Sequence, residues 1–267
     1  MRPLISVCIP TFNSEKYIIE CLQSVLNQTY TEFEIIISDN DSSDDTLNLI
    51  ESFKDERIKI FKNEKNIGMG NNFNKVCRHA SGEYIKLLPS DDTLTPDSLE
   101  KSVEPYIIND DVSLVMTAKS LVNSNSKILI EKVSFFSQGK HKSLDVTNKI
   151  LKSGRNPLGE PGLALFKKSD FVKVGGFNNN LTLVIDLDFW IKILNFGKLY
   201  FIDEPLATFR IHQNSFSLNK KAVRDYTLWI QNLDSPHLNK YNRPLILLKI
   251  RVINFIKQVL YLFLNYF

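Results

Sequence analysis

The chain has 267 residues, of which 43% are hydrophobic and 24% charged. This composition is typical of a globular protein with a sizeable core and excludes a disordered chain. The formal charge of +3, from 33 Lys and Arg against 30 Asp and Glu, argues against a nucleic-acid-binding protein. The charge is unevenly spread, because residues 221–267 hold seven Lys and Arg but two Asp.

Three cysteines, Cys8, Cys21 and Cys77, are far apart in the sequence and lack the spacing of metal ligands. They predict reduced, buried thiols in a reducing compartment. The first residues, MRPLISVCIPTFN, lack the long apolar stretch of a secretory signal, and no uninterrupted apolar run of about 18 residues predicts a spanning helix. We therefore expect a cytoplasmic protein.

Strands and helices alternate over the first 117 residues. Short apolar runs predict buried strands at 4–9, 33–38, 57–61, 83–88 and 112–117. Helical patterns lie between them, and the last of these is predicted to start at Thr95 as N-cap, with Pro96 and Asp97 in its first turn. This alternation predicts an α/β fold with a mostly parallel central sheet flanked by helices.

The rhythm changes beyond residue 118. The pattern predicts extended segments over 119–143, helices at 144–151 and 186–196, and short strands at 163–166, 199–202 and 206–211. A helical tail is predicted from near residue 221 to 267, with a break around 234–244. The whole fits one continuous domain with a C-terminal helical extension.

Ligands of parallel sheets bind at the carboxyl ends of the strands, so the loops there are candidate sites. The loop from Pro10 to Asn13 alone indicates a rigid turn. Asp39 follows the second predicted strand, and Ser42 or Ser43 explains the N-cap of the next helix without it, so Asp39 is free to bind a ribose or a base. Gly68 and Gly70 at a helix start allow close approach of a ligand, but no phosphate-binding GxxxxGK[ST] loop occurs.

Paired carboxylates and basic groups follow later strands. Asp91 and Asp92 are hard oxygen ligands that suit Mg²⁺ or Mn²⁺ bridging a diphosphate, although a solvated turn explains them equally well. Asp186 and Asp188 stand at a helix start, where the helix dipole favours acids and where one could serve as a general base. Arg210 and His212 alternate along a predicted strand end and could face one site.

Taken together and in this order, these segments resemble the family-2 glycosyltransferases of the GT-A fold over about residues 4–216. The matching segments are SVCIPTFN at Ser6–Asn13, EIIISDNDSSDDT at Glu34–Thr46, the stretch Asn66–Asp92 that ends in SDD, GEPGLALFKKSDFVKVGGFN at Gly159–Asn178, DLDFW at Asp186–Trp190 and FRIHQNSFS at Phe209–Ser217.

The resemblance implies an inverting transfer of a sugar from a nucleotide-diphosphate sugar, by default a UDP-sugar, to a hydroxyl of a glycan or lipid-linked acceptor in bacterial-type cell-surface polysaccharide biosynthesis. It implies a GT-A domain at 1–220, with a nucleotide-sugar half at 1–117 and an acceptor half at 118–220. The implied nucleotide-sugar site consists of Pro10, Thr11, Asn13, Asp39, Asn66, Gly68, Asn72 and Asp91.

The same resemblance assigns the remaining roles. A divalent metal, Mg²⁺ or Mn²⁺, would be held by Asp91, Asp92 and His212, and Asp186 would be the catalytic base. The acceptor side would be formed by Glu160, Asp188, Trp190 and Arg210. The sequence departs from the family at Pro89, where an Asp is frequent, and at Ile185, where an acid is frequent. The metal site would then rest on Asp91 and Asp92, and Asp186 would act at the base step with Asp188 as fallback.

Two other functions compete with the transferase. A nucleotidyltransferase would have a glycine-rich, basic loop after the first strand, and the loop from Pro10 to Asn13 is neither. A degenerate sugar- or nucleotide-binding module is favoured by Pro89 and opposed by the presence of Asp39, Asp91, Asp92 and Asp186.

The tail from Pro244 to Phe267 has Arg251, Asn254 and Lys257 among the polar residues on one side of a helical wheel, and apolar residues fill the rest. Because it has basic residues and no acid, this pattern predicts an interfacial helix on an anionic membrane, which would place the protein peripherally on the cytoplasmic face. Packing onto the catalytic core or onto a second copy in a homodimer explains the pattern equally well.

Overall fold

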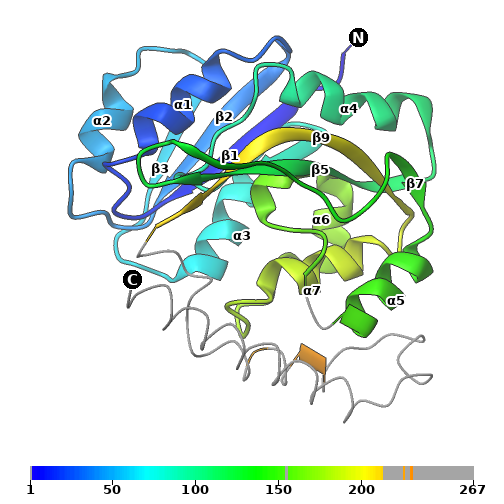
Figure 1. Cartoon of the computed structure of the whole chain (residues 1–267). Coiled ribbons are helices and arrows are strands. Elements are labelled where there is room, and N and C mark those ends of the chain that lie inside the picture. Colours follow the sequence, from blue (N-terminus) through cyan, green and yellow to red (C-terminus); the bar gives the residue numbers. More distant parts are fainter. Residues whose placement is uncertain (1, 154–155, 213–224, 226–228, 231–267) are drawn as a thin grey trace, which may run out of the picture.

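A computed structural model describes residues 2–153, 156–212, 225 and 229–230. Its centre is one nine-stranded sheet in the order β3-β2-β1-β4-β8-β5-β9-β7, with β6 paired to β5 off this path. Helices cover both faces of the sheet (Figure 1). The observed α/β architecture confirms the predicted fold class.

The first half of the sheet is entirely parallel. Its strands are β1 (Ile5–Thr11), β2 (Phe33–Asp39), β3 (Ile58–Lys62) and β4 (Tyr84–Leu87). The helices that connect them are α1 (Ile18–Leu26), α2 (Thr46–Ser52) and α3 (Met69–His79). Every residue of β1, β2 and β4 is buried, as the unbroken apolar runs of strands covered on both faces require. The predicted strands and helices of this half are thus confirmed, with ends that differ by a few residues.

The second half of the sheet contains both parallel and antiparallel strand pairs. The alternation of strands and helices in residues 1–117 gave no information about this half. Its strands are β5 (Val112–Asn123), β6 (Ile128–Val133), β7 (Gly139–His141), β8 (Ala164–Lys167) and β9 (Lys198–Ile211). Strand β9 is parallel to β5, whereas β8 is antiparallel to both β4 and β5. Strand β5 crosses the predicted boundary between residues 117 and 118, so one continuous sheet carries both predicted halves.

The helices of the second half are α4 (Ser98–Ile108), α5 (Ser143–Ser153), α6 (Lys168–Val174) and α7 (Ile185–Ile193), with a 3₁₀ turn, η1, at Pro161–Leu163. Helices α1 and α4 lie on one face of the sheet and α3, α6 and α7 on the other (Figure 1). Helix α6 was not predicted from the sequence. The prediction of Thr95 as N-cap is wrong, because α4 begins at Ser98 and Thr95 instead donates its hydroxyl to Asp97 at 2.9 Å.

Strand β9 joins two strands that the sequence predicted separately. The break was expected where Asp203, Glu204 and Pro205 interrupt the apolar pattern. The structure instead bulges there, since the pairing of β5 with β9 shifts register between Thr117 and Ala118. A bulge accommodates Pro205, which has no N–H for the ladder, and the strand continues through it.

Most of the predicted C-terminal extension, residues 221–267, lies outside the described residues. Within it, Asp225, Trp229 and Ile230 are described and buried. A carboxylate oxygen of Asp225 accepts the backbone N–H groups of Thr182 at 2.8 Å and Leu183 at 2.7 Å, next to the start of α7. These three residues therefore pack onto the domain. The tail from 244 to 267, for which the membrane, core and dimer alternatives were stated, lies outside the described residues.

The cysteines agree with the sequence analysis, because Cys8, Cys21 and Cys77 are all buried, free thiols. None of the helices in the described part of the chain has the length and the hydropathy that crossing a membrane would require.

A buried lysine stands out in β4. Lys86 of β4 is fully buried, and its Nζ has no hydrogen-bond partner among the described residues. The Oγ atoms of Ser98 and Ser102, on the buried face of α4, are likewise unpaired within the described part of the chain. Burial lowers the pKa of Lys86 to about 7, because the charged ammonium cannot be solvated there.

Replacing this lysine should stabilise the fold. In Lys86→Met we expect the free energy of unfolding at pH 7 to rise by about 2–5 kcal/mol, because the unfolded lysine is charged while the folded one must give up its proton. Since the pKa is lower in the folded state, the wild type gains stability as the pH rises from about 7 towards 10.5. Urea unfolding between pH 6.5 and 9.5 measures this. A variant less stable than the wild type, or a difference that does not shrink with rising pH, would contradict it.

Candidate active site

Asp39, at the end of β2, holds two loops together. Its carboxylate accepts the hydroxyl of Thr11 at 2.9 Å, the N–H of Ser42 at 2.9 Å and the hydroxyl of Ser42 at 2.6 Å. These bonds use three of the about four acceptor positions of a carboxylate. Ser42 therefore binds Asp39 and not the N-terminus of α2, whose first residue is Thr46. The expectation that Ser42 or Ser43 caps this helix is wrong, because its N-cap is Asp45.

The loop after β1 is joined to the same turn. Pro10 lies within β1 opposite Ser38, so the strand continues past the predicted end at Ile9. Asn13, with a left-handed φ of 49°, accepts the N–H of Ser43 at 2.9 Å, and its own N–H binds the hydroxyl of Ser42 at 2.9 Å. The predicted nucleotide-site residues of β1 and β2 are thus brought together at one edge of the sheet.

Side-chain amides form the next part of this edge. The buried Asn72 of α3 accepts the hydroxyl of Ser38 at 2.7 Å and donates to the carbonyl of Ser38 at 2.9 Å. Asn40 donates to Asn66 at 2.9 Å, and Asn66 in turn accepts the N–H of Gly68, whose φ is 84°. Asn72 is therefore buried structure beneath the site, whereas Asn66 and Gly68 are exposed at its rim.

Two members of this amide network were missed by the sequence analysis. Asn40 accepts the N–H of Ile67 at 2.9 Å, and Asn63 donates to Asn40 at 3.0 Å and to Asn72 at 3.2 Å. The position of Asn40 directly after the second predicted strand, beside Asp39, was the available signal. Asn63 directly follows β3 and gave the same signal.

Asp91 and Asp92 lie between the ends of β4 and β9. The carboxylate of Asp91 is 3.0 Å from Nε2 of His212. Asp92 is buried, and one of its carboxylate oxygens accepts the N–H of Arg210 at 2.9 Å. Burial and the neighbouring charge of Asp91 raise the pKa of Asp92. The structure thus brings Asp91 and His212 together and turns Asp92 towards the backbone of β9.

Arg210 has a different place from the one the sequence predicted. Its side chain is 1% exposed, and its guanidinium donates to the carbonyl of Asp91 at 2.8 Å, to the hydroxyl of Ser126 at 2.8 Å and to Glu20 at 2.8 Å. The guanidinium carbon also lies 4.5 Å from the ring centroid of Tyr17. Arg210 is enclosed by protein, so its assignment to the acceptor side is corrected.

Asp186 is at the first turn of α7 and is partly buried. One carboxylate oxygen accepts the backbone N–H of Leu187, the next residue, at 2.7 Å. The other accepts the side-chain amide of Asn156 at 3.0 Å. Burial, reinforced by the negative charge of Glu160, raises the pKa of Asp186 to about 7. A carboxylate whose pKa lies this near neutrality is suited to take and release a proton.

Glu160 and Lys119 form an ion pair beside Asp186. Nζ of Lys119, on β5, is 2.5 Å from the carboxylate of Glu160. The Lys119 side chain is 10% exposed and that of Glu160 is 29% exposed, so the carboxylate is the more accessible partner. Lys119 was not identified from the sequence, because a single lysine in an apolar strand gives no sign of what it faces.

Two further predicted acceptor residues do not reach this site. Trp190 is fully buried and packs against Phe166 and Phe189, with ring centroids 5.7 and 5.3 Å away. Asp188 is 5% exposed and paired with Lys192 at 2.6 Å, and two residues along a helix it points away from Asp186. Both assignments are corrected: Trp190 is core, and Asp188 is no substitute for Asp186.

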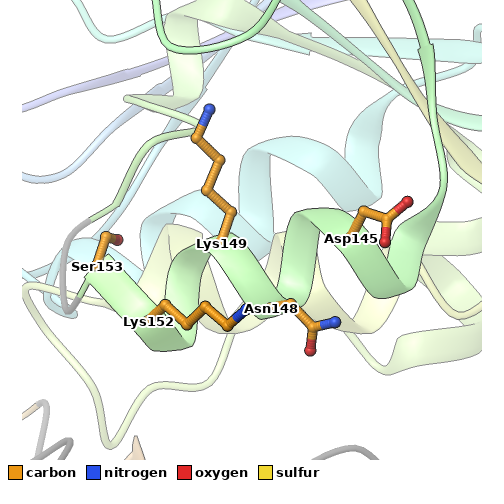
Figure 2. Close-up of a pocket in the computed structure, with 5 residues that line it drawn as sticks. All are labelled: Asp145, Asn148, Lys149, Lys152 and Ser153. Carbon is orange, nitrogen blue, oxygen red and sulfur yellow. The ribbon is translucent and has the colours of Figure 1, made fainter.

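The described residues contain no preformed metal cage, because no three His, Cys, Asp or Glu side chains among them gather into a group that could hold an ion. A surface hollow of about 470 Å³ does not mark the site either. It is lined by Asp145, Asn148, Lys149, Lys152 and Ser153, all from α5, and Figure 2 shows these side chains diverging from one helix. The candidate site is thus the edge formed by the loops after β1, β2 and β4, by His212 directly after β9 and by the start of α7.

Comparison with known sequences identifies the family. Residues 6–175 match the family model described as glycosyl transferase family 2. An uncharacterized glycosyltransferase of Methanocaldococcus jannaschii is 34% identical over 236 residues, covering 85% of this chain and 79% of that protein. The Escherichia coli protein WfgD, named UDP-Glc:alpha-D-GlcNAc-diphosphoundecaprenol beta-1,3-glucosyltransferase, is 35% identical over 123 residues, 46% of this chain and 48% of its own.

Solved structures share the fold. Residues 1–349 of S. aureus TarS in complex with UDP-GlcNAc superpose with a TM-score of 0.69 at 20% identity, covering 93% of this chain and 71% of that one. The mannosyltransferase PcManGT from Pyrobaculum calidifontis, in complex with GDP-Man and Mn²⁺, has a TM-score of 0.66 at 18% identity and covers 94% and 74% of the two chains. At these identities the likeness concerns the fold alone.

The enclosed guanidinium predicts a stability effect. In Arg210→Lys we expect the free energy of unfolding to fall by about 2–4 kcal/mol, because an ammonium group cannot supply the planar set of donors that Asp91, Ser126 and Glu20 accept. Glu20→Gln is the matched control and should cost less than about 1 kcal/mol, since the Glu20 side chain is 45% exposed. Urea unfolding of both variants measures this, and a lysine variant as stable as the wild type would show that the prediction is wrong.

Proposed function

The chain belongs to glycosyl transferase family 2, and on that premise we propose that it moves a sugar from a UDP-sugar to a hydroxyl of a glycan or lipid-linked acceptor in polysaccharide biosynthesis. Two observations support the proposal. Asp91 and His212 lie 3.0 Å apart beyond the strand ends. The charge of Glu160 acts on both Asp92 and Asp186. Relatives support the donor and acceptor classes, because WfgD is named for a UDP-Glc donor and a diphosphoundecaprenol-linked acceptor.

The two parts of the chain divide the substrates in this proposal. Residues 1–117 bind the nucleotide-sugar through Thr11, Asn13 and Asp39, which line one connected pair of loops. Residues 118–220 contribute Asp186 and Glu160 on the acceptor side. The relative WfgD is named for a lipid-linked acceptor. In this proposal the basic tail at 244–267 contacts the anionic membrane that holds such an acceptor.

Proton removal is assigned to Asp186. Its carboxylate takes the proton of the acceptor hydroxyl while the hydroxyl oxygen forms a bond to the anomeric carbon, and the bond from that carbon to the nucleoside diphosphate breaks. A single displacement of this kind inverts the anomeric configuration. The backbone N–H of Leu187 and the amide of Asn156 hold the two oxygens of Asp186, so that its carboxylate has a fixed direction.

The residues near Asp91 fit a divalent cation. The carboxylate of Asp91 and Nε2 of His212 are 3.0 Å apart, and a cation bound there would offset the repulsion from Asp91 that helps to raise the pKa of Asp92. Mg²⁺ and Mn²⁺ in such sites take one or two carboxylates together with substrate phosphates, so a complete protein cage is not needed. Asp91 and His212, with Asp92 behind them, would hold the ion, which when bound neutralises charge on the leaving diphosphate.

The first test removes the proposed base. We expect Asp186→Asn to lower kcat by about 10²–10⁴-fold and to leave the dissociation constant of the UDP-sugar nearly unchanged, because the amide keeps the shape but cannot accept the proton. In the wild type, kcat should fall as the pH drops through about 7, since the carboxylate must be ionised. Release of nucleoside diphosphate and donor binding by calorimetry measure the two effects. An equal loss of donor affinity would contradict the role of Asp186.

The second test concerns the cation. We expect EDTA to stop turnover and Mn²⁺ or Mg²⁺ to restore it. Asp91→Asn and His212→Ala should each raise the Mn²⁺ concentration for half-maximal activity by at least about tenfold, because each removes one ligand. Asp111→Asn is the control, since Asp111 is exposed and paired with Lys198 and Lys140 away from this edge. Full activity in the chelator would refute the metal requirement.

A further inference from the structure

We propose that Asn156 is a positioning residue for Asp186, and that the turn it closes links this carboxylate to the Glu160–Lys119 pair, which orients the acceptor hydroxyl. The inference rests on the proposed function, because it assumes that Asp186 removes a proton. It adds two residues, Asn156 and Lys119, to which neither the sequence pattern nor the family resemblance gave a role.

The first step is the direction of the Asp186 carboxylate. Its two oxygens are held by donors from different segments: the N–H of Leu187 at 2.7 Å belongs to α7, and the amide of Asn156 at 3.0 Å belongs to the loop after α5. With one donor on each oxygen, the carboxylate plane is fixed. Because Asn156 is neutral at every pH, it orients the carboxylate without competing for the proton.

The second step is the turn from residue 156 to 160. The same amide group of Asn156 also donates to the carbonyl of Gly159 at 3.0 Å, and its oxygen accepts the N–H groups of Leu158 at 3.1 Å and Gly159 at 3.2 Å. Gly159 has a φ of 90°, and a Cβ there would lie 2.5 Å from Leu163. The side chain of Asn156 therefore sets the shape of a turn that only glycine can complete.

The third step is what this turn presents. Glu160 directly follows Gly159, and its carboxylate is held by Lys119 at 2.5 Å. Nζ of Lys119 also lies 4.7 Å from the ring centroid of Phe209 on β9, and this contact helps to hold the ammonium group in place. The 29% exposed carboxylate of Glu160 is then left as an oriented acceptor for a sugar hydroxyl.

Within the described part of the chain, Glu160 and Lys119 are the charged groups that act on Asp186, and their effects are opposite. The negative charge of Glu160 raises the pKa of Asp186, and the positive charge of Lys119 lowers it. The amide of Asn156 favours the ionised carboxylate, because a donated N–H stabilises negative charge. Changes at these positions should therefore move the acid side of the pH profile in directions that can be stated beforehand.

The experiment compares Asn156→Ala, Asn156→Asp and Glu160→Gln with the wild type, using kcat against pH, the KM for a UDP-sugar and the melting temperature. For Asn156→Ala we expect kcat at pH 7 to fall by about tenfold, the acid limb to move up by about one pH unit and the donor KM to stay within about twofold. Asn156→Asp, which adds a like charge, should move the limb further up. Glu160→Gln should move the limb down and raise the acceptor KM.

Asn109→Ala is the matched control, because Asn109 also donates its side-chain amide to a backbone carbonyl, that of Pro105 at 2.9 Å, at the end of α4. It should leave the acid limb and kcat unchanged. A melting temperature that falls in Asn156→Ala with an unmoved acid limb, or limbs that do not follow the stated order, would overturn the inference. Asp186→Asn separates it from the proposed function: an active Asp186→Asn overturns both, whereas an inactive one beside an unaffected Asn156→Ala overturns the positioning role alone.

Discussion

The candidate site depends on one buried cation, the guanidinium of Arg210. A buried charge is tolerated only when acceptors surround it, and here they come from separate parts of the chain. Glu20 belongs to α1, Ser126 to the turn between β5 and β6, and the carbonyl of Asp91 to the loop after β4. The backbone of the same arginine binds Asp92. Because these groups must all meet at one point, the loop that carries Asp91 is held against the end of β9, where His212 follows two residues later.

The carboxylates at this edge differ in chemistry because their surroundings differ. Asp39 accepts three hydrogen bonds from Thr11 and Ser42 and serves to hold loops in place. Asp186 accepts two and is partly buried beside the negative charge of Glu160, which brings its pKa to about 7. Asp39 therefore has a structural role in the loops, whereas the surroundings of Asp186 allow it to exchange a proton near neutral pH. The assignment of Asp186 as base follows from this difference as well as from the family to which the chain belongs.

The sequence predicted the first half of the sheet well because each of its strands is a short apolar run between turn-forming residues, and that signal is local. The carboxylates Asp39, Asp91 and Asp186 were proposed as site residues on a local signal too, since each lies at or shortly after the end of a strand or in the first turn of a helix. The assignments that failed depend on contacts between residues that are far apart in the sequence. Trp190 and Arg210 look like site residues in the sequence, but core packing and a ring of acceptors enclose them. Asn156 and Lys119 look ordinary, and only the fold brings them beside Asp186 and Glu160.

The register of β9 shows how such long-range placement is set. Leu114 pairs with Leu199, whereas Val122 pairs with Arg210, so three more residues of β9 than of β5 lie between these two pairs. The bulge around Pro205 takes up this excess. Without the bulge, Arg210 would lie beyond Asn123, the last residue of β5. Its guanidinium could then neither donate to the carbonyl of Asp91 nor pack against the ring of Tyr17. A shift by a single residue would instead turn the side chains of Arg210 and His212 to the opposite face of the sheet. An irregular stretch that reads in the sequence as the end of a strand is therefore what brings His212 to Asp91.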